Sequence, residues 1–355
     1  MTDAHYERAL ALFGQGHYAQ GAEVLAQASR AGHVPSMSML GGQLLTGRGI
    51  PVDTPGGIRL IMAAAERGGG FACATAANLF AWGYHSGRPD WPRALNYLQR
   101  AAELGYQPAQ TQLRLLSGYK AGIDWTKLRR AIDIAAWRKF PKPLALSEDP
   151  QIGAVPGLLS AELCDTLIAR ARPLLAPAKL YNELKGGRTR GDERRNSSAH
   201  FDLMGADLVV LAVCERLCAL AGLPAIHAES LQVLHYKVGE YFAPHVDFWE
   251  PSFEGNAATL AKHGQRVVTV LVYLNDDGLE GGETDFPRLG LRHRGGKGDG
   301  LMFRNVDVEG RGDYRTLHAG LPPTQGEKWI LSLWIRDRPP AGCGDPRTAA
   351  AMEGR

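Results

Sequence analysis

Cysteine, net charge and long apolar runs are all scarce in this 355-residue chain, and each shortage excludes a class of protein. The five cysteines are odd in number, scattered and without metal-motif spacing, which argues against a disulfide framework and favours buried free thiols. A formal charge of +3 lacks the concentrated basic face that nucleic-acid binding usually requires. No apolar run approaches the roughly 20 residues needed to span a membrane.

What the composition does contain is typical of a globular protein with two domains. Hydrophobic residues make up 45% of the chain and charged residues 22%, and its length is comfortable for two cores. The first residues, Met-Thr-Asp-Ala-His-Tyr-Glu, lack the basic and apolar regions of a secretory signal. Together with the free thiols, this predicts a protein of the reducing cytoplasm that binds neither nucleic acid nor membrane.

The first third of the chain is repetitive. Similar helix ends recur at residues 28–32, 64–68 and 101–105, in steps of 36 and 37 residues. Each closes an amphipathic stretch and is followed, after a short Gly- or Pro-containing turn, by a second stretch rich in small residues. A helix pair every 34 to 40 residues, roughly, is typical of an α-solenoid, in which neighbouring repeats supply each other's core. We therefore predict a helical repeat domain over residues 1–120.

The repeats resemble the Sel-like branch of the tetratricopeptide family over about residues 5–118. The Ala-Ala-Glu-x-Gly helix ends and the loop Gly-Arg-Gly-Ile-Pro-Val-Asp at residues 47–53 carry this resemblance, and the first repeat is degenerate. The resemblance implies a concave face that binds peptides or proteins. An array this short is equally compatible with a purely structural extension of the neighbouring domain.

Prolines at positions 141, 143 and 150 mark residues 121–150 as a linker, which begins with a basic helix over residues 124–139. The second domain is expected over residues 151–340. Residues 341–355 are rich in Gly, Pro and Ala and are expected to form a flexible tail.

The second domain starts with helices near residues 157–172 and 207–221. Between them lies a Gly- and Arg-rich loop at residues 179–195, which is either a substrate lid or a solvated loop. From residue 231 onward short β-branched and apolar runs predict strands, including a central strand at 266–275. The predicted fold class is α+β, a helical solenoid followed by a double-sheet barrel packed on helices.

One extended stretch of the second domain carries the pattern of a metal site. His245 and Asp247 lie two residues apart, so in an extended chain both side chains point the same way, about 7 Å apart. Two imidazoles and one carboxylate suit Fe(II). A His-x-Asp pair also arises by chance on surface strands. The hypothesis therefore depends on a third ligand from another strand, for which His318 is the candidate.

Lys328 opens an apolar strand on which alternation places Lys328, Ile330 and Trp334 on one face. A buried ammonium requires a partner, and a dicarboxylate co-substrate would supply one. On the central strand, the same alternation places Thr269 and Tyr273 on one face, where a hydroxyl and a phenol could point toward the same ligand.

Several motifs of the second domain follow one another in an order typical of a known enzyme family. They are His245-x-Asp247, Arg-Val-Val-Thr-Val-Leu-Val-Tyr-Leu-Asn at 266–275, Glu-Gly-Gly-Glu-Thr-Asp-Phe-Pro at 280–287, Gly-Asp-Gly-Leu-Met-Phe at 298–303, His318-Ala-Gly and Gly-Glu-Lys-Trp at 326–329. Over roughly residues 150–338 the chain resembles the prolyl 4-hydroxylase branch of the 2-oxoglutarate/Fe(II) dioxygenases. The resemblance implies a double-stranded β-helix, or jelly roll, with iron held by His245, Asp247 and His318. It also implies that Lys328 binds the distal carboxylate of 2-oxoglutarate, helped by Tyr236, Thr269 or Tyr273.

The activity that the resemblance implies is hydroxylation of an aliphatic carbon with O2 and 2-oxoglutarate, releasing succinate and CO2, with ascorbate as a reductant. The expected substrate is a prolyl or other residue in a peptide or protein, because a repeat domain could hold a polypeptide. One alternative is a free amino acid or small metabolite, and another is an inactive scaffold. The presence of all three ligand types and of Lys328 argues against the scaffold. The candidate substrate contacts are Arg195, Ser197, Trp249 and Trp334, and the oligomeric state is left open.

Overall fold

The computed structural model describes residues 2–119, 124–178, 180–182, 187–189, 193–202, 205–339 and 352. The chain divides into two compact units, one of residues 1–136, 202–213 and 342–355 and the other of residues 137–201 and 214–341. Apart from Met352, the tail expected at 341–355 lies outside the described residues, as does part of the loop at 179–195. Over the described ranges, no helix combines the length and apolarity that crossing a bilayer would require.

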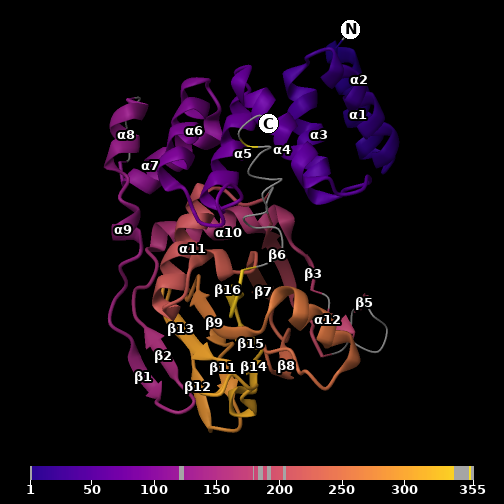
Figure 1. Ribbon diagram of the computed structural model, residues 1–355. Coiled ribbons are helices and arrows are strands. Elements are labelled where there is room, and N and C mark those ends of the chain that lie inside the picture. The colour runs from indigo at the N-terminus through magenta and orange to yellow at the C-terminus, as the bar shows by residue number, and fades with distance from the viewer. Residues whose placement is uncertain are drawn as a thin grey trace. The chain divides into compact units, whose positions relative to one another are not determined.

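The first unit is a run of helices in which each one packs on its neighbours in sequence (Figure 1). This arrangement confirms the predicted array of helix pairs. The helices are α1 (Thr2–Gly14), α2 (Tyr18–Arg30), α3 (Val34–Thr46), α4 (Thr54–Glu66), α5 (Gly70–Ala81), α6 (Trp91–Glu103), α7 (Gln107–Ser117) and α8 (Trp125–Ala131).

Glycine explains the repeated helix ends. Gly32, Gly68 and Gly105 follow α2, α4 and α6 and have φ angles of 83°, 84° and 82°. Side chains with a β-carbon rarely adopt this left-handed conformation, so glycine stops each helix at the same point of the repeat. At the other end, the carboxylates of Asp53 and Asp90 cap α4 and α6 by accepting backbone N–H bonds from the first turn.

The basic helix expected over residues 124–139 is broken in two, so that prediction was wrong. After α8 the chain turns, and α9 (Ile134–Trp137) starts again. The Asp133 carboxylate accepts two backbone N–H bonds at 2.9 and 3.1 Å from the start of α9. Such local side-chain bonds compete with a continuous helix.

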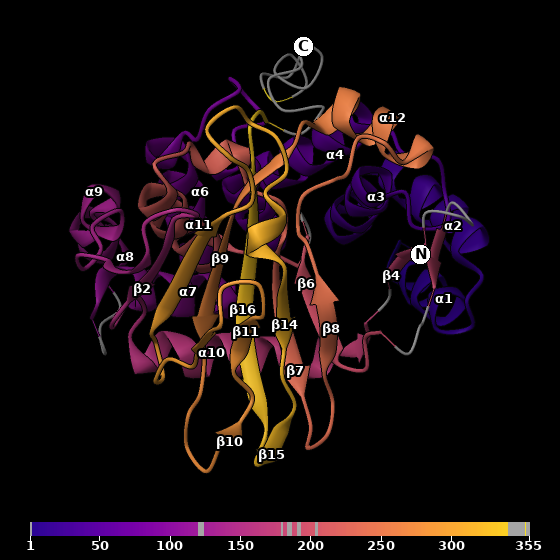
Figure 2. The same ribbon diagram turned by 90° about the horizontal axis from the view of Figure 1, so that it is seen from below.

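The second unit is built around two antiparallel sheets. Along the large sheet the strands follow the order β1 (Leu144–Ser147), β2 (Ile152–Val155), β13 (Gly300–Arg304), β9 (Arg266–Tyr273), β16 (Lys328–Arg336), β7 (Leu231–Tyr236), β6 (Ser197–Phe201) and β3 (Ala176–Pro177). Along the small sheet the order is β12 (Leu291–His293), β11 (Thr284–Phe286), β14 (His318–Gly320) and β8 (Phe242–His245). Figure 2 shows the small sheet in front of β7 and β16. One apolar core joins them, because Tyr236, Leu271 and Ile330 of the large sheet cluster with Phe242 and Phe286 of the small sheet. This is the expected double-sheet barrel.

The other strands of this unit form two short pairs, β4 (Leu180–Asn182) with β5 (Gly187–Thr189) and β10 (Glu280–Gly281) with β15 (Pro323–Gln325). Its helices include α10 (Ala161–Ala171), which packs against β7, and α12 (Glu254–His263). Helix α11 (Leu208–Ala221) runs from residues of the first unit into the second.

The central strands explain the apolar runs of the sequence. Every residue of β7 is buried, and so are all but one of β16, because both faces of these strands are covered. The strand expected at 266–275 is β9, which lies between β13 and β16. This sheet therefore forms one wall of the site, and the small sheet forms the other.

Candidate active site

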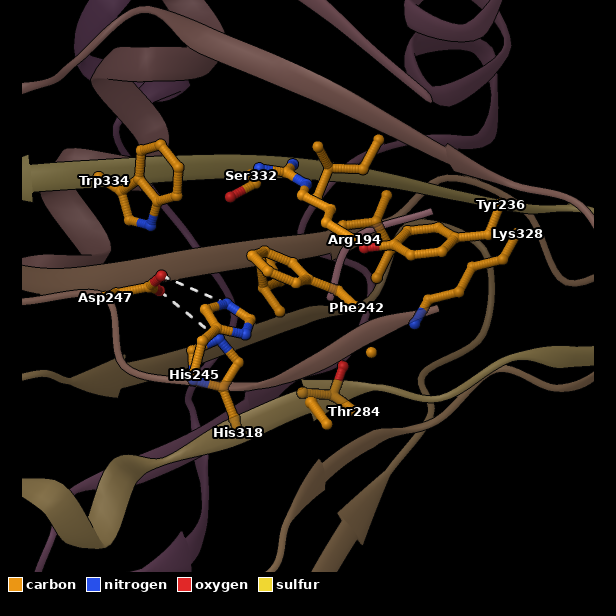
Figure 3. A pocket seen from close by; sticks show the side chains of 15 residues that line it. Arg194, Tyr236, Phe242, His245, Asp247, Thr284, His318, Lys328, Ser332 and Trp334 are labelled. Atoms are coloured by element: carbon orange, nitrogen blue, oxygen red, sulfur yellow. Dashed lines mark ion pairs between the residues drawn. The ribbon is translucent and has the colours of Figure 1, made fainter. Parts of the chain in front are cut away.

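His245, Asp247 and His318 lie together between the two sheets (Figure 3). His245 ends β8 and His318 opens β14, and the two residues are register partners across this strand pair. The Asp247 carboxylate lies 3.7 Å from Nε2 of His245 and 3.6 Å from Nε2 of His318. The three ligand atoms all lie within 4.8 Å of one another, so the structure brings together the three residues that the sequence singled out.

Backbone hydrogen bonds fix the tautomer of both imidazoles. Nδ1 of His245 lies 2.8 Å from the carbonyl oxygen of Ala243, and Nδ1 of His318 lies 3.1 Å from that of Thr316. Since a carbonyl only accepts, each Nδ1 carries a proton and donates, and each Nε2 is the ring nitrogen that lies on the side of Asp247. Metal-binding histidines usually donate their other ring N–H to a carbonyl or carboxylate in this way.

The electrostatics suit a metal ligand set. Burial, and then the neighbouring His318, lower the pKa of His245 to about 3, which keeps its ring neutral. Burial alone would raise the pKa of Asp247, but the two imidazoles and a hydroxyl hydrogen bond lower it overall. Two imidazoles and one carboxylate on one side of a buried pocket are the donor set that Fe(II) takes in oxygenases.

Thr269 contacts the Asp247 carboxylate rather than the co-substrate end of the pocket. Its hydroxyl donates to Asp247 Oδ2 at 2.7 Å and accepts from the Asn305 amide at 2.9 Å. Thr269 and Asn305 are completely buried. Its position on β9 thus places it beside Asp247, and it does not line the pocket, so the structure gives no support to its expected contact with 2-oxoglutarate, which stays a prediction.

Lys328 lies in the same pocket as the triad but at its other end (Figure 3). It is 1% exposed, and burial lowers its pKa to about 7, an effect that Glu283 partly opposes. Its register partner on β7 is Tyr236, and Nζ lies 5.1 Å from the centroid of that ring. Burial raises the pKa of Tyr236 to about 12, so its phenol stays protonated and can donate.

Thr284 is a residue of this end that the sequence reasoning missed. It lines the pocket from β11, while Tyr273 does not line it. The Tyr273 hydroxyl lies 3.0 Å from Thr284 Oγ1 and donates to the carbonyl of His293 at 3.1 Å. Thr284 thus lies between Tyr273 and the pocket, and a direct contact of Tyr273 with the co-substrate stays a prediction. The alternation of the motif at 280–287 could have revealed Thr284.

The pocket fits a short dicarboxylate. It runs from Lys328 at one end to the triad at the other. Two glycines leave room at the Lys328 end: a β-carbon at Gly282 would lie 3.2 Å from Lys328 Cδ, and one at Gly320 would lie 3.2 Å from the Tyr236 hydroxyl. Among the described residues that line the pocket, Asp247 is the carboxylate, so a bound acid would supply the counter-charge that Lys328 needs.

The four candidate substrate contacts occupy different places. Trp334 lines the pocket, on the same strand face as Lys328. Trp249 does not line it and packs near Arg266, whose guanidinium carbon lies 5.3 Å from the indole centroid. Arg195 is exposed beside Tyr241, and Ser197 pairs with β7 in the large sheet, so neither lines the pocket.

Arg194 takes the place expected of Arg195. Its backbone bridges to Phe242, and its guanidinium carbon lies 4.4 Å from the centroid of that ring. Phe242 in turn stacks on the imidazole of His245, with 3.6 Å between the ring centroids. Neighbouring residues of an extended segment face opposite ways, and nothing in the sequence gave the register of this segment, so Arg194 rather than Arg195 lines the pocket. A substrate contact of Arg195 stays a prediction.

With this geometry in place, comparisons with known proteins define the class. The model of the 2OG-Fe(II) oxygenase superfamily matches residues 231–336. The chain is 31% identical over 211 residues to prolyl 4-hydroxylase 1 of Arabidopsis thaliana, a match that covers 56% of this chain and 72% of the relative.

Two solved structures are similar to parts of the chain. The viral collagen prolyl hydroxylase of Paramecium Bursaria Chlorella virus-1, in its 2OG complex, is 28% identical with a TM-score of 0.40, covering 52% of this chain and 95% of that one. A Sel1 repeat protein from Oxalobacter formigenes is 21% identical with a TM-score of 0.30, covering 39% of this chain and 61% of that one.

The chain belongs to the prolyl 4-hydroxylase family of 2-oxoglutarate- and Fe(II)-dependent oxygenases. It is a dioxygenase of this class that carries helical repeats before the catalytic unit, and Fe(II) and 2-oxoglutarate are its cofactor and co-substrate.

Proposed function

We propose that this dioxygenase hydroxylates a prolyl residue, or another residue with an aliphatic carbon, in a peptide or protein. The observation that carries the proposal is one pocket that contains a His-Asp-His triad at one end and a buried lysine at the other. Similarity to prolyl 4-hydroxylase 1 of Arabidopsis thaliana supports the choice of prolyl substrates.

In the proposed site, His245, Asp247 and His318 hold the iron through Nε2, a carboxylate oxygen and Nε2. Bound Fe(II) with O2 supplies the oxidising chemistry that amino-acid side chains lack. The backbone carbonyls behind both histidines hold Nδ1 protonated and orient each ring so that Nε2 faces the metal position, and Thr269 holds the Asp247 carboxylate in one orientation.

Lys328 binds the distal carboxylate of 2-oxoglutarate by a charge-assisted contact, the Tyr236 hydroxyl donates to the same carboxylate, and Thr284 lines that end of the pocket. Because Lys328 is buried, the contact selects a dicarboxylate over a monocarboxylate, which would leave the ammonium unpaired. It also fixes the keto acid in one orientation toward the triad. Trp334 forms the wall that the substrate meets.

The proposal extends to the surroundings of the site. The helical repeats hold the polypeptide substrate, since arrays of this kind bind chains in extended form. The buried free thiols of Cys73, Cys164, Cys214 and Cys218 support a reducing compartment, the cytoplasm. Ascorbate serves as the reductant, and omitting it from a reaction in which 2-oxoglutarate turns over repeatedly tests that role.

Conversion of 2-oxoglutarate to succinate tests the triad. The wild-type protein is expected to form succinate only when Fe(II) is added, and to transfer oxygen to a proline-rich peptide, seen as a 16 Da gain by mass spectrometry. Asp247→Ala should abolish both, because two imidazoles alone hold the metal poorly. Undiminished Fe(II)-dependent succinate formation by Asp247→Ala would refute the assignment of the ligands.

A free amino acid or small metabolite is the competing substrate class. Comparing free proline with proline-rich peptides of increasing length on the full chain separates the two. The polypeptide proposal expects KM to fall as the peptide lengthens, and efficient hydroxylation of free proline alone would overturn it.

A further inference from the structure

Trp334 presents a buried N–H group that has no acceptor among the described residues. The residue lines the pocket, and Figure 3 shows the nitrogen-bearing edge of its indole turned toward Asp247. Buried donors in folded proteins are almost always paired, and an exception in a binding pocket indicates an acceptor that arrives with the ligand. An oxygen atom of a bound molecule is the natural partner.

The oxygen atom that accepts from the Trp334 N–H belongs more naturally to the peptide substrate than to 2-oxoglutarate. Lys328 and Trp334 share one face of β16 but are six positions apart, which is roughly 20 Å along a strand. The lysine is 1% exposed, whereas the indole is partly exposed. Trp334 therefore stands at the open end of the pocket, where the second reactant enters.

Arg266 holds the indole in this orientation. Its guanidinium carbon lies 3.6 Å from the centroid of the Trp334 ring, the distance of a face-to-face stack. The guanidinium is itself fixed by Glu229, which accepts from its Nε at 2.6 Å and from its Nη2 at 2.9 Å. A planar group clamped by two bonds cannot rotate, so the ring stacked on it is held as well.

The same guanidinium reaches the backbone of the triad. Nη1 of Arg266 donates to the carbonyl oxygen of Asp247 at 3.5 Å. Arg336 also binds Glu229, with Nη2 to Oε1 at 2.7 Å, but its other recorded bond goes to the carbonyl of Gly264. The half-buried Arg266 and the buried Arg336 thus share one carboxylate. Among the ring contacts of the described residues, only that of Arg266 involves Trp334.

We propose that Arg266, clamped by Glu229, is a positioning residue that holds Trp334 so that its N–H donates to a backbone carbonyl oxygen of the peptide substrate. This inference rests on the proposed function, because it requires a peptide in the pocket. It adds a specific contact, and the device that fixes it, to the triad and the co-substrate lysine.

The test combines Arg266→Lys, which keeps the charge but loses the planar stack, with Trp334→Phe, which keeps a ring but loses the donor. Each variant is expected to raise KM for a proline-rich peptide about tenfold, the size of one hydrogen bond. KM for 2-oxoglutarate should change less than about twofold. The double variant should be no worse than Trp334→Phe, because both changes remove the same contact.

Arg336→Lys is the matched control. It also removes a buried guanidinium from Glu229, so it reproduces any general loss of stability, but it should leave KM for the peptide near the wild-type value. If Arg266→Lys fails to fold, Glu229→Gln loosens the same clamp and is expected to raise KM for the peptide and to spare KM for 2-oxoglutarate.

The outcomes separate this inference from the proposed function. A wild-type protein that does not hydroxylate the peptide would refute the proposed function. A working wild-type protein whose two single variants retain normal KM for the peptide, or act additively when combined, would refute the positioning role alone. A rise in KM for 2-oxoglutarate instead of the peptide would place the acceptor oxygen on the co-substrate and overturn the proposal.

Discussion

At the scale of single residues, two threonine hydroxyls lie at opposite ends of the site, one beside the metal ligands and one beside Lys328. Thr269 donates to Asp247 at 2.7 Å, whereas Thr284 lines the pocket beside Lys328 and contacts the Tyr273 hydroxyl at 3.0 Å. Thr269 is 0% and Thr284 3% exposed to solvent, so water does not replace the partner of either hydroxyl. They form a matched pair for separating metal binding from co-substrate binding.

Thr269→Val should weaken Fe(II) affinity about 10- to 100-fold, the usual effect of removing a side chain that orients a ligand. Thr284→Val should instead raise KM for 2-oxoglutarate and leave Fe(II) affinity unchanged. Titration with Fe(II) under anaerobic conditions and initial-rate measurements give the two quantities. An Fe(II) affinity lowered equally by both variants would contradict this division.

Lys328 should couple co-substrate binding to proton uptake. Burial lowers its pKa to about 7, and a bound carboxylate raises that pKa by placing opposite charge beside the ammonium. Above pH 7 the bound state therefore holds more protons than the free state. Affinity for 2-oxoglutarate should fall as pH rises above about 7, by at most about tenfold per unit.

Calorimetry of 2-oxoglutarate binding at pH 8, with Mn(II) in place of Fe(II), measures this uptake from the dependence of the heat on the buffer. Lys328→Arg is the control, because a guanidinium stays charged and should bind without taking up a proton. Identical heats in all buffers for the wild-type protein would show that Lys328 is already charged before binding.

At the scale of elements, the pairing of strands decides which side chains meet. The alternation of β16 was predictable from its sequence, and Lys328, Ile330 and Trp334 do line the pocket from one face. The same reasoning on β9 placed Thr269 and Tyr273 on the correct face but could not place them along the pocket. That position depends on which strands of the small sheet lie opposite, and sequence alone does not give this pairing.

The close approach of β14 to β7 gives an element-scale prediction. A β-carbon at Gly320 would lie 3.2 Å from the Tyr236 hydroxyl, so Gly320→Ala should displace the phenol and raise KM for 2-oxoglutarate severalfold. Tyr236→Phe removes the atom that would clash. The double variant should then behave like Tyr236→Phe alone in initial-rate measurements, and a further loss in the double variant would mean that Gly320 acts elsewhere.

At the scale of the whole molecule, periodicity predicted the repeats and motif order predicted the barrel. The three glycines at helix ends and the apolar central strands carried enough local information to define both kinds of architecture. The short helices α8 and α9 show the limit of such prediction, because the side chain of Asp133 interrupts a stretch whose composition favours one helix.

If the repeats bind the polypeptide, weakening them should affect peptide binding but not the reaction of 2-oxoglutarate. Asp90 caps α6 by accepting the N–H of Arg93 at 3.1 Å, so Asp90→Ala should destabilise the repeat unit by about 1 kcal/mol. Succinate formation without peptide should remain at the wild-type rate. Thermal unfolding and KM for a long peptide, measured at a temperature near the onset of unfolding, test whether the repeats contribute to holding the polypeptide. A KM that stays constant while the repeats unfold would contradict that role.

The burial of Lys328 also determines the order in which the two substrates bind and the products leave. Its end of the pocket is almost sealed, whereas the Trp334 end retains exposure to solvent. A molecule that is to reach the lysine has to pass the triad and the indole before a peptide covers them. Reaction should therefore follow a compulsory sequence in which the small acid enters ahead of the polypeptide, and succinate departs only after the hydroxylated chain has gone.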